Sequence, residues 1–320
     1  MESSRFLVTG GAGFIGSNIA EYLINEGHYV RVLDNFSSGK EENLTFAQGL
    51  GKDKFELIRG DIRDKDMCEK ATQGIDYVSH QAALRSVPKS LEDPLSYNHV
   101  NIDGTFFMLE ACLKNKVKRF VMASSSSVFG DTDQFPEEEG QLPLLISPYA
   151  LSKLAGEYYC RIFTENFGLE TVALRYFNVY GPRQALDDEY AVVIPKFIHC
   201  VLNDQAPPIY GTGKQSRDFT YIDNVVSANV LSMTTPGLKH EVFNVANGSD
   251  HSVLELLEAI NQIIGKDVKP EFCPPRAGDV FKTHANIARI MEKTGFKPLV
   301  NFKDGLEKTV EYFRGQTPIN

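Results

Sequence analysis

A glycine-rich turn near the start of the chain constrains the fold more than any other feature. A short apolar run, Phe6–Val8, predicts a strand buried on both faces, and Gly10, Gly13 and Gly16 follow it at a spacing of three. Glycine accepts positive φ and lets a ligand approach the backbone closely. An apolar periodicity over Ile15–Ile24 then predicts a helix, whose free N–H groups at its start suit a pyrophosphate. The alternative is a glycine turn that holds no ligand.

A second predicted strand supports the nucleotide interpretation. This strand, Val30–Leu33, ends at Asp34, where an acidic residue for a ribose hydroxyl is expected. The polar turn Asn35–Lys40 suits an adenosine ribose. A third strand, Phe55–Ile58, ends before a polar turn at residues 59–62, which would lie beside the adenine.

Asp61, in that polar turn, has two compatible interpretations. It can lie beside the adenine, and it can be the N-cap of a helix over Arg63–Thr72.

Strand and helix patterns continue to alternate through the first half of the chain. Apolar runs predict strands at Asp76–His80, Arg119–Ser124 and Thr171–Phe177, and a long amphipathic helix is expected over Pro94–Lys114. This alternation predicts a doubly wound, Rossmann-type parallel sheet in an α/β domain.

The alternation weakens beyond residue 180, where short strands are mixed with helix patterns such as Ala191–Leu202 and Val253–Ile264. We expect a smaller α/β substrate lobe that closes over the first domain. The expected division is an NAD-binding domain at 1–180 and a mainly substrate-binding lobe at 181–320, with a return of the chain to the first domain at about 214–235.

Polar residues at the end of the Arg119–Ser124 strand indicate a second part of the site. Four serines, Ser124–Ser127, are poor strand formers, but they suit a loop that lines a polar ligand. A solvated turn is the alternative. Tyr149 and Lys153 are four residues apart on a predicted helix and therefore share one face.

This Tyr–Lys pair suggests proton transfer coupled to hydride transfer. A free tyrosine, with a pKa near 10, is a poor base at neutral pH. A nearby ammonium and a positively charged nicotinamide ring both favour the phenolate. The residues therefore predict NAD-dependent interconversion of an alcohol and a carbonyl.

Composition and charge limit the kinds of partner and the location that we expect for this chain. The 320 residues carry a formal net charge of −9 and contain no strongly basic block, which argues against nucleic acid. No apolar run is long enough to span a membrane, and the first strand leaves no room for a signal peptide. The five cysteines are scattered and form no Cys-x-x-Cys pair, so we expect reduced thiols, a cytoplasmic location and no metal.

The combined motifs resemble the extended short-chain dehydrogenase/reductase superfamily across essentially the whole chain. They are the glycine turn Gly10–Gly16, the serine strand end, Tyr149-x-x-x-Lys153 and Arg175-Tyr-Phe-Asn178. Within that superfamily the chain is most similar to NAD-dependent UDP-hexose 4-epimerases. The matching segments are Gln81–Pro88, Tyr149–Lys153, Asn178–Arg183, Ser216–Tyr221 and Pro275–Asp279.

The resemblance implies a catalytic set and a reaction cycle. Ser125 supplies the catalytic hydroxyl, Tyr149 is the base, and Lys153 is its partner and also binds the nicotinamide ribose. The sugar is oxidised at carbon 4, the 4-keto intermediate rotates, and the hydride returns to the opposite face. Many relatives are homodimers that pair through helices corresponding to Pro94–Lys114 and Tyr149–Phe167.

Motif and resemblance together give the expected contacts. Contacts with the NAD cofactor are expected from Gly10, Gly13, Phe14, Ile15, Gly16, Asp34, Asn35, Ser37, Ser38, Gly39, Asp61, Ile62, Gln81, Ala82, Ala83, Asn101, Ser124, Tyr149, Lys153, Tyr176 and Phe177. Contacts with a UDP-sugar substrate are expected from Arg85, Ser86, Ser125, Ser126, Ser127, Tyr149, Asn178, Val193, Tyr210, Arg217, Phe219, Arg276, Asp279 and Thr283.

The resemblance also indicates a substrate preference. Thr283 stands where a bulky tyrosine restricts related enzymes to plain glucose and galactose, so a small residue leaves room for a 2-acetamido group. The segment Arg85–Val87 is similar to that of epimerases favouring N-acetylated sugars. We therefore expect UDP-GlcNAc and UDP-GalNAc as substrates, with UDP-glucose and UDP-galactose also accepted. Phe129 replaces a usual tyrosine, and we expect no consequence.

The sequence bears on three alternatives. A 4,6-dehydratase needs an acid–base pair directly after the catalytic hydroxyl, but Ser126 and Ser127 stand there. A UDP-glucuronate 4-epimerase or decarboxylase needs a cation for the sugar carboxylate, which Arg85, Lys89 or Arg183 could supply. A non-catalytic NAD-sensing regulator is the candidate from another class, although it should have lost the Tyr–Lys pair. NADP is disfavoured because Asp34 would repel a 2′-phosphate.

Overall fold

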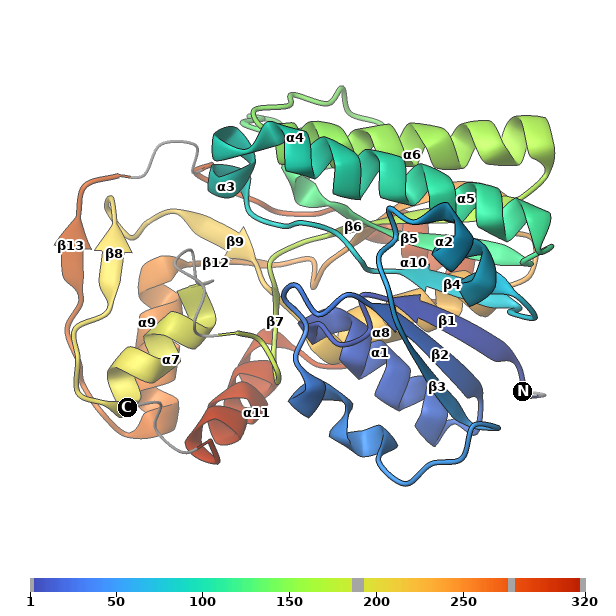
Figure 1. Cartoon of the computed structure of the whole chain (residues 1–320). Helices are drawn as coiled ribbons and strands as arrows, with labels where there is room; N and C mark the ends of the chain where they lie inside the picture. The colour runs from blue at the N-terminus through green and yellow to red at the C-terminus, as the bar shows by residue number, and fades with distance from the viewer. Residues whose placement is uncertain (1–2, 186–192, 276–279, 317–320) are drawn as a thin grey trace.

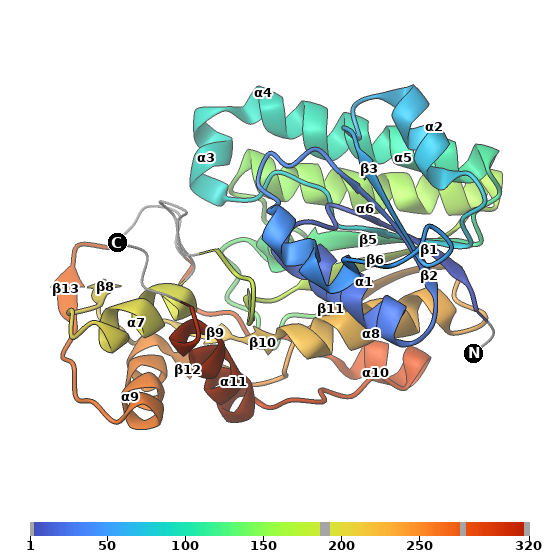
Figure 2. The same cartoon turned by 60° about the horizontal axis from the view of Figure 1, so that its bottom comes forward.

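The computed structural model describes residues 3–185, 193–275 and 280–316. Two layers of helices enclose a parallel sheet, and a smaller lobe lies beside the carboxyl edge of that sheet (Figures 1 and 2). No helix within these described ranges is both long and apolar enough to cross a membrane.

Within the described ranges, seven parallel strands form the central sheet in the order β3-β2-β1-β4-β5-β6-β11. Their bounds are β1 (Arg5–Thr9), β2 (Tyr29–Asp34), β3 (Phe55–Arg59), β4 (Tyr77–His80), β5 (Arg119–Ser125), β6 (Glu170–Tyr176) and β11 (His240–Val245). The strand order reverses between β1 and β4, and open sheets of this kind bind ligands at that reversal. The predicted doubly wound fold is confirmed.

Helices cover both faces of the sheet because the inner strands bury apolar side chains on both sides. One face packs against α1 (Phe14–Asn25) and α8 (Ile222–Thr234). The other packs against α2 (Lys65–Thr72), α5 (Gly104–Lys114) and α6 (Pro148–Phe167). Figure 1 shows these as the lower and upper layers.

The predicted helix Pro94–Lys114 is present as one continuous helical run, but its middle is a π-helix. After α3 (Val87–Glu92), the chain forms α4 (Pro94–Tyr97), a π-helical segment η2 (Asn98–Asp103) and then α5. A π-helix has a wider turn than an α-helix and is often found at functional sites.

The predicted cap of α2 is one turn too early. The helix begins at Lys65, and the Asp64 carboxylate accepts the N–H groups of Asp66 and Met67. Asp61 instead accepts the backbone N–H of Arg63 in the preceding turn and binds the Arg63 guanidinium. Asp61 therefore stays in the loop after β3.

The chain returns to the central sheet within the predicted 214–235, where α8 lies, and the return continues beyond it to β11. Helix α8 packs on β4, β5 and β6, and β11 extends the sheet by pairing with β6. The run Val242–Val245, which the sequence placed in the smaller lobe, is therefore part of an edge strand of the main sheet. Helix α10 (Ala288–Thr294) packs against β11.

The smaller lobe consists of short strand pairs and three helices within the described ranges. Its helices are α7 (Val193–Leu202), α9 (Val253–Ile264) and α11 (Phe302–Arg314). The strands pair as β7 (Val179–Tyr180) with β10 (Thr220–Tyr221), β8 (Pro208–Tyr210) with β13 (Glu271–Cys273), and β9 (Ser216–Asp218) with β12 (Asp250–Ser252). Helix α9 confirms the predicted Val253–Ile264, and its Gly265 cap has φ +82°. Two 3₁₀ segments complete the elements, η1 (Glu41–Ala47) and η3 (Ser126–Phe129).

Candidate active site

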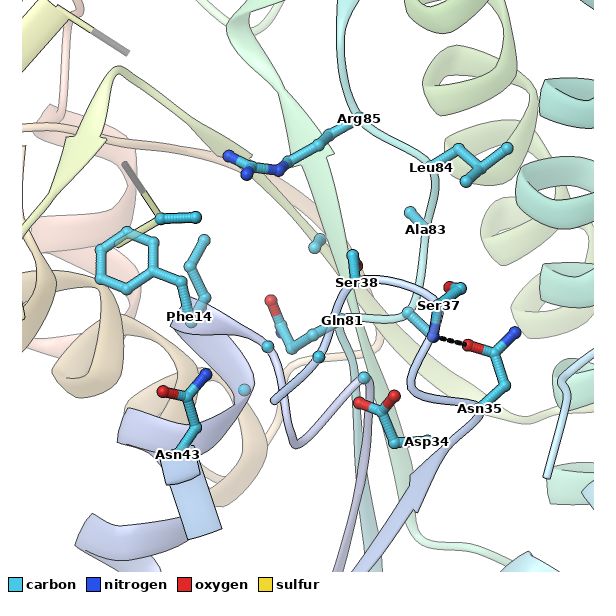
Figure 3. Close-up of a pocket in the computed structure, with 18 of the residues that line it drawn as sticks. Phe14, Asp34, Asn35, Ser37, Ser38, Asn43, Gln81, Ala83, Leu84 and Arg85 are labelled. Carbon is cyan, nitrogen blue, oxygen red and sulfur yellow. Dashed lines mark hydrogen bonds between the residues drawn. The ribbon is translucent and has the colours of Figure 1, made fainter. Parts of the chain in front are cut away.

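A cavity of about 1190 Å³ follows the carboxyl edge of the central sheet. This volume exceeds the 300–1,000 Å³ of an ordinary small-ligand pocket, so there is room for a dinucleotide and a second molecule. The predicted residues that line it are Gly10, Gly13, Phe14, Ile15, Gly16, Asp34, Asn35, Ser37, Ser38, Gly39, Asp61, Ile62, Gln81, Ala82, Ala83, Arg85, Ser124, Ser125, Tyr149, Lys153, Tyr176 and Asn178. Figure 3 shows part of this wall, with Arg85 and Gln81 extending from the segment after β4.

The glycine turn fits a bound pyrophosphate. A Cβ at Gly16 would lie 2.2 Å from the Gly10 carbonyl oxygen, and a Cβ at Gly10 would lie 2.8 Å from the Ala82 nitrogen. Gly10 also has φ +65°. Helix α1 begins after Gly13 without a side-chain cap from any described residue, so its first N–H groups are available to an anion.

The other end of the cavity has the polar groups expected for an adenosine. Asp34 is buried, and its carboxylate accepts the backbone N–H groups of Ala12 and Phe36, both at 2.8 Å. Asn35 donates its amide to Asp61 at 2.9 Å. The Arg63 guanidinium and the Asn35 amide hold the pKa of Asp61 well below its ordinary value, so this carboxylate is charged at neutral pH.

The catalytic candidates meet where β5 ends and α6 begins. The Lys153 Nζ donates to the Ala123 carbonyl at 2.9 Å and lies 5.9 Å from the centre of the Tyr149 ring. The Ser125 Oγ lies 2.9 Å from the Ser127 Oγ. This places one ammonium, one phenol and one serine hydroxyl at the same section of the cavity wall.

The ionisation of Tyr149 differs from the prediction. Burial raises its pKa, while a hydrogen bond with Ser125 and the charge of Arg85 act in the opposite direction. Lys153 was expected to favour the phenolate, but burial lowers the pKa of Lys153 itself to about 8. In the protein alone the phenol is therefore protonated at neutral pH.

Helix α6 is fixed to the sheet by a buried ion pair one turn beyond Lys153. The carboxylate of Glu157 binds the Arg175 guanidinium at 2.8 Å and accepts the hydroxyl of Ser124 at 2.5 Å. Since Ser124 precedes Ser125, this pair connects the α6 face that carries Tyr149 with the serine strand end.

Two predicted cofactor contacts do not reach the cavity wall. Asn101 in η2 is buried, and its amide binds both backbone groups of Leu84 and the hydroxyl of Ser152. Phe177 is fully buried beside Phe129. The role of Asn101 visible in the structure is to hold the loop after β4, because both ends of its amide are occupied there.

Fewer of the predicted substrate contacts than of the predicted cofactor contacts lie on the cavity wall. Phe219 is 2% exposed and packs between Tyr180 and Phe302, so its side chain belongs to the core rather than to a uridine site. Thr283 is buried behind the cavity wall, where its hydroxyl accepts the Asn178 amide at 3.0 Å and the Asp218 N–H at 3.2 Å. Tyrosine at 283 would have to displace Asn178.

Other predicted substrate residues lie beside the described wall rather than in it. Ser86 caps α3, and the Arg217 guanidinium donates to the carbonyls of Val280 and Phe281. Ser126, Ser127, Val193 and Tyr210 are not part of the wall either. Arg276 and Asp279 lie outside the described residues.

The structure adds wall residues that the sequence did not assign to the cofactor. Tyr312 from α11 and Gln316 beyond it reach the cavity from the C-terminal end of the chain, and no local pattern could indicate this. Arg183, considered only for a sugar carboxylate, also lines the wall and pairs with Glu21 of α1. Within the described part of the chain, the Arg183 Nη1 is buried without a hydrogen-bond partner.

Strained backbone is concentrated around this cavity. Phe36, Ser86, Asn178 and Arg183 adopt φ values between +34° and +100°, which side chains other than glycine rarely occupy. Asn178 and Arg183 line the wall, while Phe36 and Ser86 adjoin residues that do. Such conformations cluster at ligand sites, where surrounding contacts maintain them.

A glycine turn that leads along one cavity to a Ser–Tyr–Lys set is the arrangement of an extended short-chain dehydrogenase/reductase, as the sequence indicated. Residues 6–246 match the sequence model of the NAD dependent epimerase/dehydratase family. The chain belongs to this family, and NAD is its cofactor.

Three named relatives match nearly the whole length of this chain. UDP-glucose 4-epimerase of Mycolicibacterium smegmatis is 38% identical over 315 residues, which cover 98% of this chain and 99% of that protein. UDP-N-acetylglucosamine 4-epimerase of Methanobrevibacter ruminantium M1, solved with UDP-N-acetylmuramic acid, has a TM-score of 0.94 and 41% identity, covering 99% and 100% of the two chains. UDP-glucuronic acid 4-epimerase of Bacillus cereus, solved with UDP-glucuronic acid and NAD, has a TM-score of 0.88 and 35% identity, covering 97% and 99%.

Proposed function

We propose that this protein is an isomerase that inverts carbon 4 of a UDP-hexose with NAD as cofactor. The observation that carries the proposal is the position of Tyr149, Lys153 and Ser125 on the wall of the cavity that begins at the glycine turn. One cavity can thus hold a dinucleotide beside a second ligand. The relatives described above are UDP-sugar 4-epimerases, which supports the same activity.

Each residue of the catalytic set has its own role in the proposed reaction. NAD, when bound, supplies the hydride acceptor and later returns the hydride. Tyr149 takes the proton of the sugar 4-hydroxyl and returns it to the same oxygen when the opposite face of the 4-keto group is reduced. Its pKa is raised in the protein alone, so positive charge must favour the phenolate; Arg85 supplies some, and a bound nicotinamide ring would add to it. Ser125 donates to the same oxygen.

The residues after Ser125 support epimerisation over dehydration. Ser126 and Ser127 form the start of η3, and neither hydroxyl can act as the acid–base pair that abstracts a carbon 5 proton and protonates a leaving hydroxyl. The sugar therefore leaves the site with its hydroxyl groups intact.

We propose UDP-GlcNAc and UDP-GalNAc as the preferred pair, with UDP-glucose and UDP-galactose also accepted. Thr283 is small and lies directly behind Asn178, so the hexose end of the cavity can be wider than with a tyrosine there. The Methanobrevibacter relative acts on an N-acetylated sugar, which supports this choice. Asn178, Arg217, Arg276 and Asp279 are the proposed contacts to the nucleotide.

UDP-glucuronate is the second candidate substrate. Arg85 lines the same cavity as Tyr149 and influences its ionisation, so a guanidinium lies near the proposed position of the reacting sugar. A carboxylate on the hexose could pair with it. The Bacillus cereus relative is an epimerase of this acidic sugar.

We also propose a cytoplasmic homodimer. Leu151, Tyr158 and Ile162 on α6 are exposed and share one face of the helix, and Leu95 on α4 is exposed as well. A second copy of the chain would cover this apolar surface. Sedimentation of the wild type and of Ile162→Glu tests the interface, and a monomeric wild type would contradict it.

The proposed location rests on a separate observation. The five free cysteines suit a reducing compartment.

The activity is tested by following three substrates separately by NMR without added reductant. We expect UDP-GalNAc to form from UDP-GlcNAc and Tyr149→Phe to slow this conversion by about 10²–10⁴-fold, because the base is removed. Conversion of UDP-glucose alone would refute the preference but not the reaction. Conversion of UDP-glucuronate alone would favour the second candidate, and no conversion of any of them would refute the proposed activity.

A further inference from the structure

A closed ring of hydrogen bonds lies on the α8 side of the cavity wall. The Asn229 amide nitrogen donates to the Tyr176 hydroxyl at 2.8 Å, and that hydroxyl donates to the Gln81 Oε1 at 3.2 Å. The Gln81 amide nitrogen completes the ring by donating to the Asn229 Oδ1 at 3.1 Å. These three side chains come from α8, β6 and the end of β4.

Asn229 fixes the orientation of the ring because all of its polar capacity is used. Its second N–H donates to the Val225 carbonyl at 2.8 Å, and its oxygen also accepts the Ser79 hydroxyl at 3.1 Å. Turning the amide over would place its N–H groups against other donors. Asn229 is fully buried and is not part of the cavity wall, whereas Gln81 and Tyr176 are.

The ring adjoins the catalytic section of the cavity. Tyr176 pairs in register with Ser125, and Gln81 follows β4, which is the other neighbour of β5. Lys153 and Tyr149 come from α6 on the opposite face of the sheet. Gln81 and Tyr176 therefore form the wall on one side of the reacting section, and the catalytic groups form it on the other.

We propose that Asn229 is a positioning residue for the cofactor. It holds Gln81 and Tyr176 in one orientation and so sets how tightly NAD is retained at the reacting end of the cavity. Without Asn229, the buried Tyr176 hydroxyl loses its donor, and the half-buried Gln81 amide nitrogen keeps only its bond to the Ser79 hydroxyl, so both side chains are free to turn. The inference rests on NAD as the cofactor and does not depend on which sugar is the substrate.

The test measures NAD dissociation from the full-length protein loaded with NAD⁺. Released NAD⁺ is trapped by an added alcohol dehydrogenase with ethanol and recorded as NADH absorbance. Asn229→Leu, of similar volume, removes all four hydrogen bonds. Asn224→Leu is the matched control, since Asn224 is an equally buried asparagine on the same helix whose amide binds the backbone of Leu299 and Val300 instead. Asn229→Ser provides a second variant if Asn229→Leu does not fold.

We expect Asn229→Leu to release NAD about tenfold faster than Asn224→Leu, the effect of one lost hydrogen bond to the wall. In a Tyr176→Phe background the effect of Asn229→Leu should shrink, because both changes break the same ring. Equal release from the two leucine variants, or full additivity with Tyr176→Phe, would overturn the inference. Activity on a sugar is not needed, so failure here is separate from failure of the proposed reaction.

Discussion

Different physical means organise the smaller lobe and the part of the molecule built on the seven-stranded sheet, which we call the cofactor half. In the cofactor half, parallel strands and helices repeat, and every strand of the main sheet brings its carboxyl end to the same edge. In the smaller lobe the strand pairs are only two or three residues long. Distant segments are held there by buried polar side chains that bind backbone groups.

Two acidic residues illustrate the second means: Asp218 in the lobe, and Glu137 in the segment after η3 that pairs with residues 284–286. Asp218 is fully buried and accepts the backbone N–H groups of Asn247, Gly248 and Ala285. Glu137 is 1% exposed and accepts the N–H of His284 at 2.6 Å. Burial raises the pKa of both carboxyls to about 7.

The contrast with Glu157 is instructive. Glu157 is as deeply buried, but the guanidinium of Arg175 neutralises it. The buried carboxylate of Glu157 is thus paired with a cation, whereas Asp218 and Glu137 accept backbone N–H groups. Stability should therefore depend on pH through Asp218 and Glu137, whereas the glycine turn of the cofactor half should respond to changes in close packing.

The largest expected effect is on the glycine turn. In Gly16→Ala the new Cβ would meet the Gly10 carbonyl oxygen at 2.2 Å, so the turn must open. Overpacking of this kind costs about 1–3 kcal/mol, and we expect NAD affinity to fall by about a hundredfold. Calorimetric titration with NAD⁺ measures it. Gly140→Ala is the control because its Cβ would meet open space. Unchanged affinity in Gly16→Ala would show that the turn does not hold the cofactor.

A smaller effect, confined to the substrate, is expected at Thr283. In Thr283→Tyr the ring must displace Asn178 and fill the space proposed for the acetamido group. We expect kcat/KM for UDP-GlcNAc to fall about tenfold relative to that for UDP-glucose, while NAD affinity is unchanged. Competition assays with both sugars give this ratio. A weaker NAD affinity would show that the two halves are coupled more closely than their structures indicate.

The smallest effect is expected on stability at Glu137. Its folded pKa, about 7, lies above its ordinary value of 4.5. Below pH 4.5 the folded and unfolded states are both protonated, so the carboxyl costs nothing. Between pH 4.5 and 7 only the unfolded state ionises, so stability falls as pH rises, and above pH 7 the full cost remains.

Glu137→Gln removes this cost and can still accept the His284 N–H through its amide oxygen. We therefore expect a gain of about 1–2 kcal/mol at pH 8 and no gain at pH 4, measured by urea unfolding. The same gain at both pH values would mean that ionisation is not its source.

The sequence predicted the cofactor half well because its signals are local. Three of these signals depend on only a few neighbouring residues each. They are the strand periodicity, the spacing of the glycines, and the separation of Tyr149 and Lys153 by one helical turn. The burial of Phe219 and the placement of Thr283 behind Asn178 depend on contacts between segments far apart in the chain, so no local pattern reveals them.

The same reason explains the missed parts of the fold and site. The pairing of β11 with β6 and the approach of Tyr312 to the cavity are tertiary events. The raised pKa of Tyr149 was missed because burial, which the sequence does not show, outweighs the hydrogen bond with Ser125 and the charge of Arg85.

The central claim is that a hydride leaves carbon 4 of a UDP-sugar and returns to the same carbon within one cavity. The most direct measurement is turnover of UDP-GlcNAc deuterated at carbon 4, in ordinary water, with the product examined by NMR. We expect UDP-GalNAc to keep its deuterium at carbon 4, because the cofactor carries it out and back. Formation of UDP-GalNAc with hydrogen from the solvent at carbon 4 would refute this mechanism.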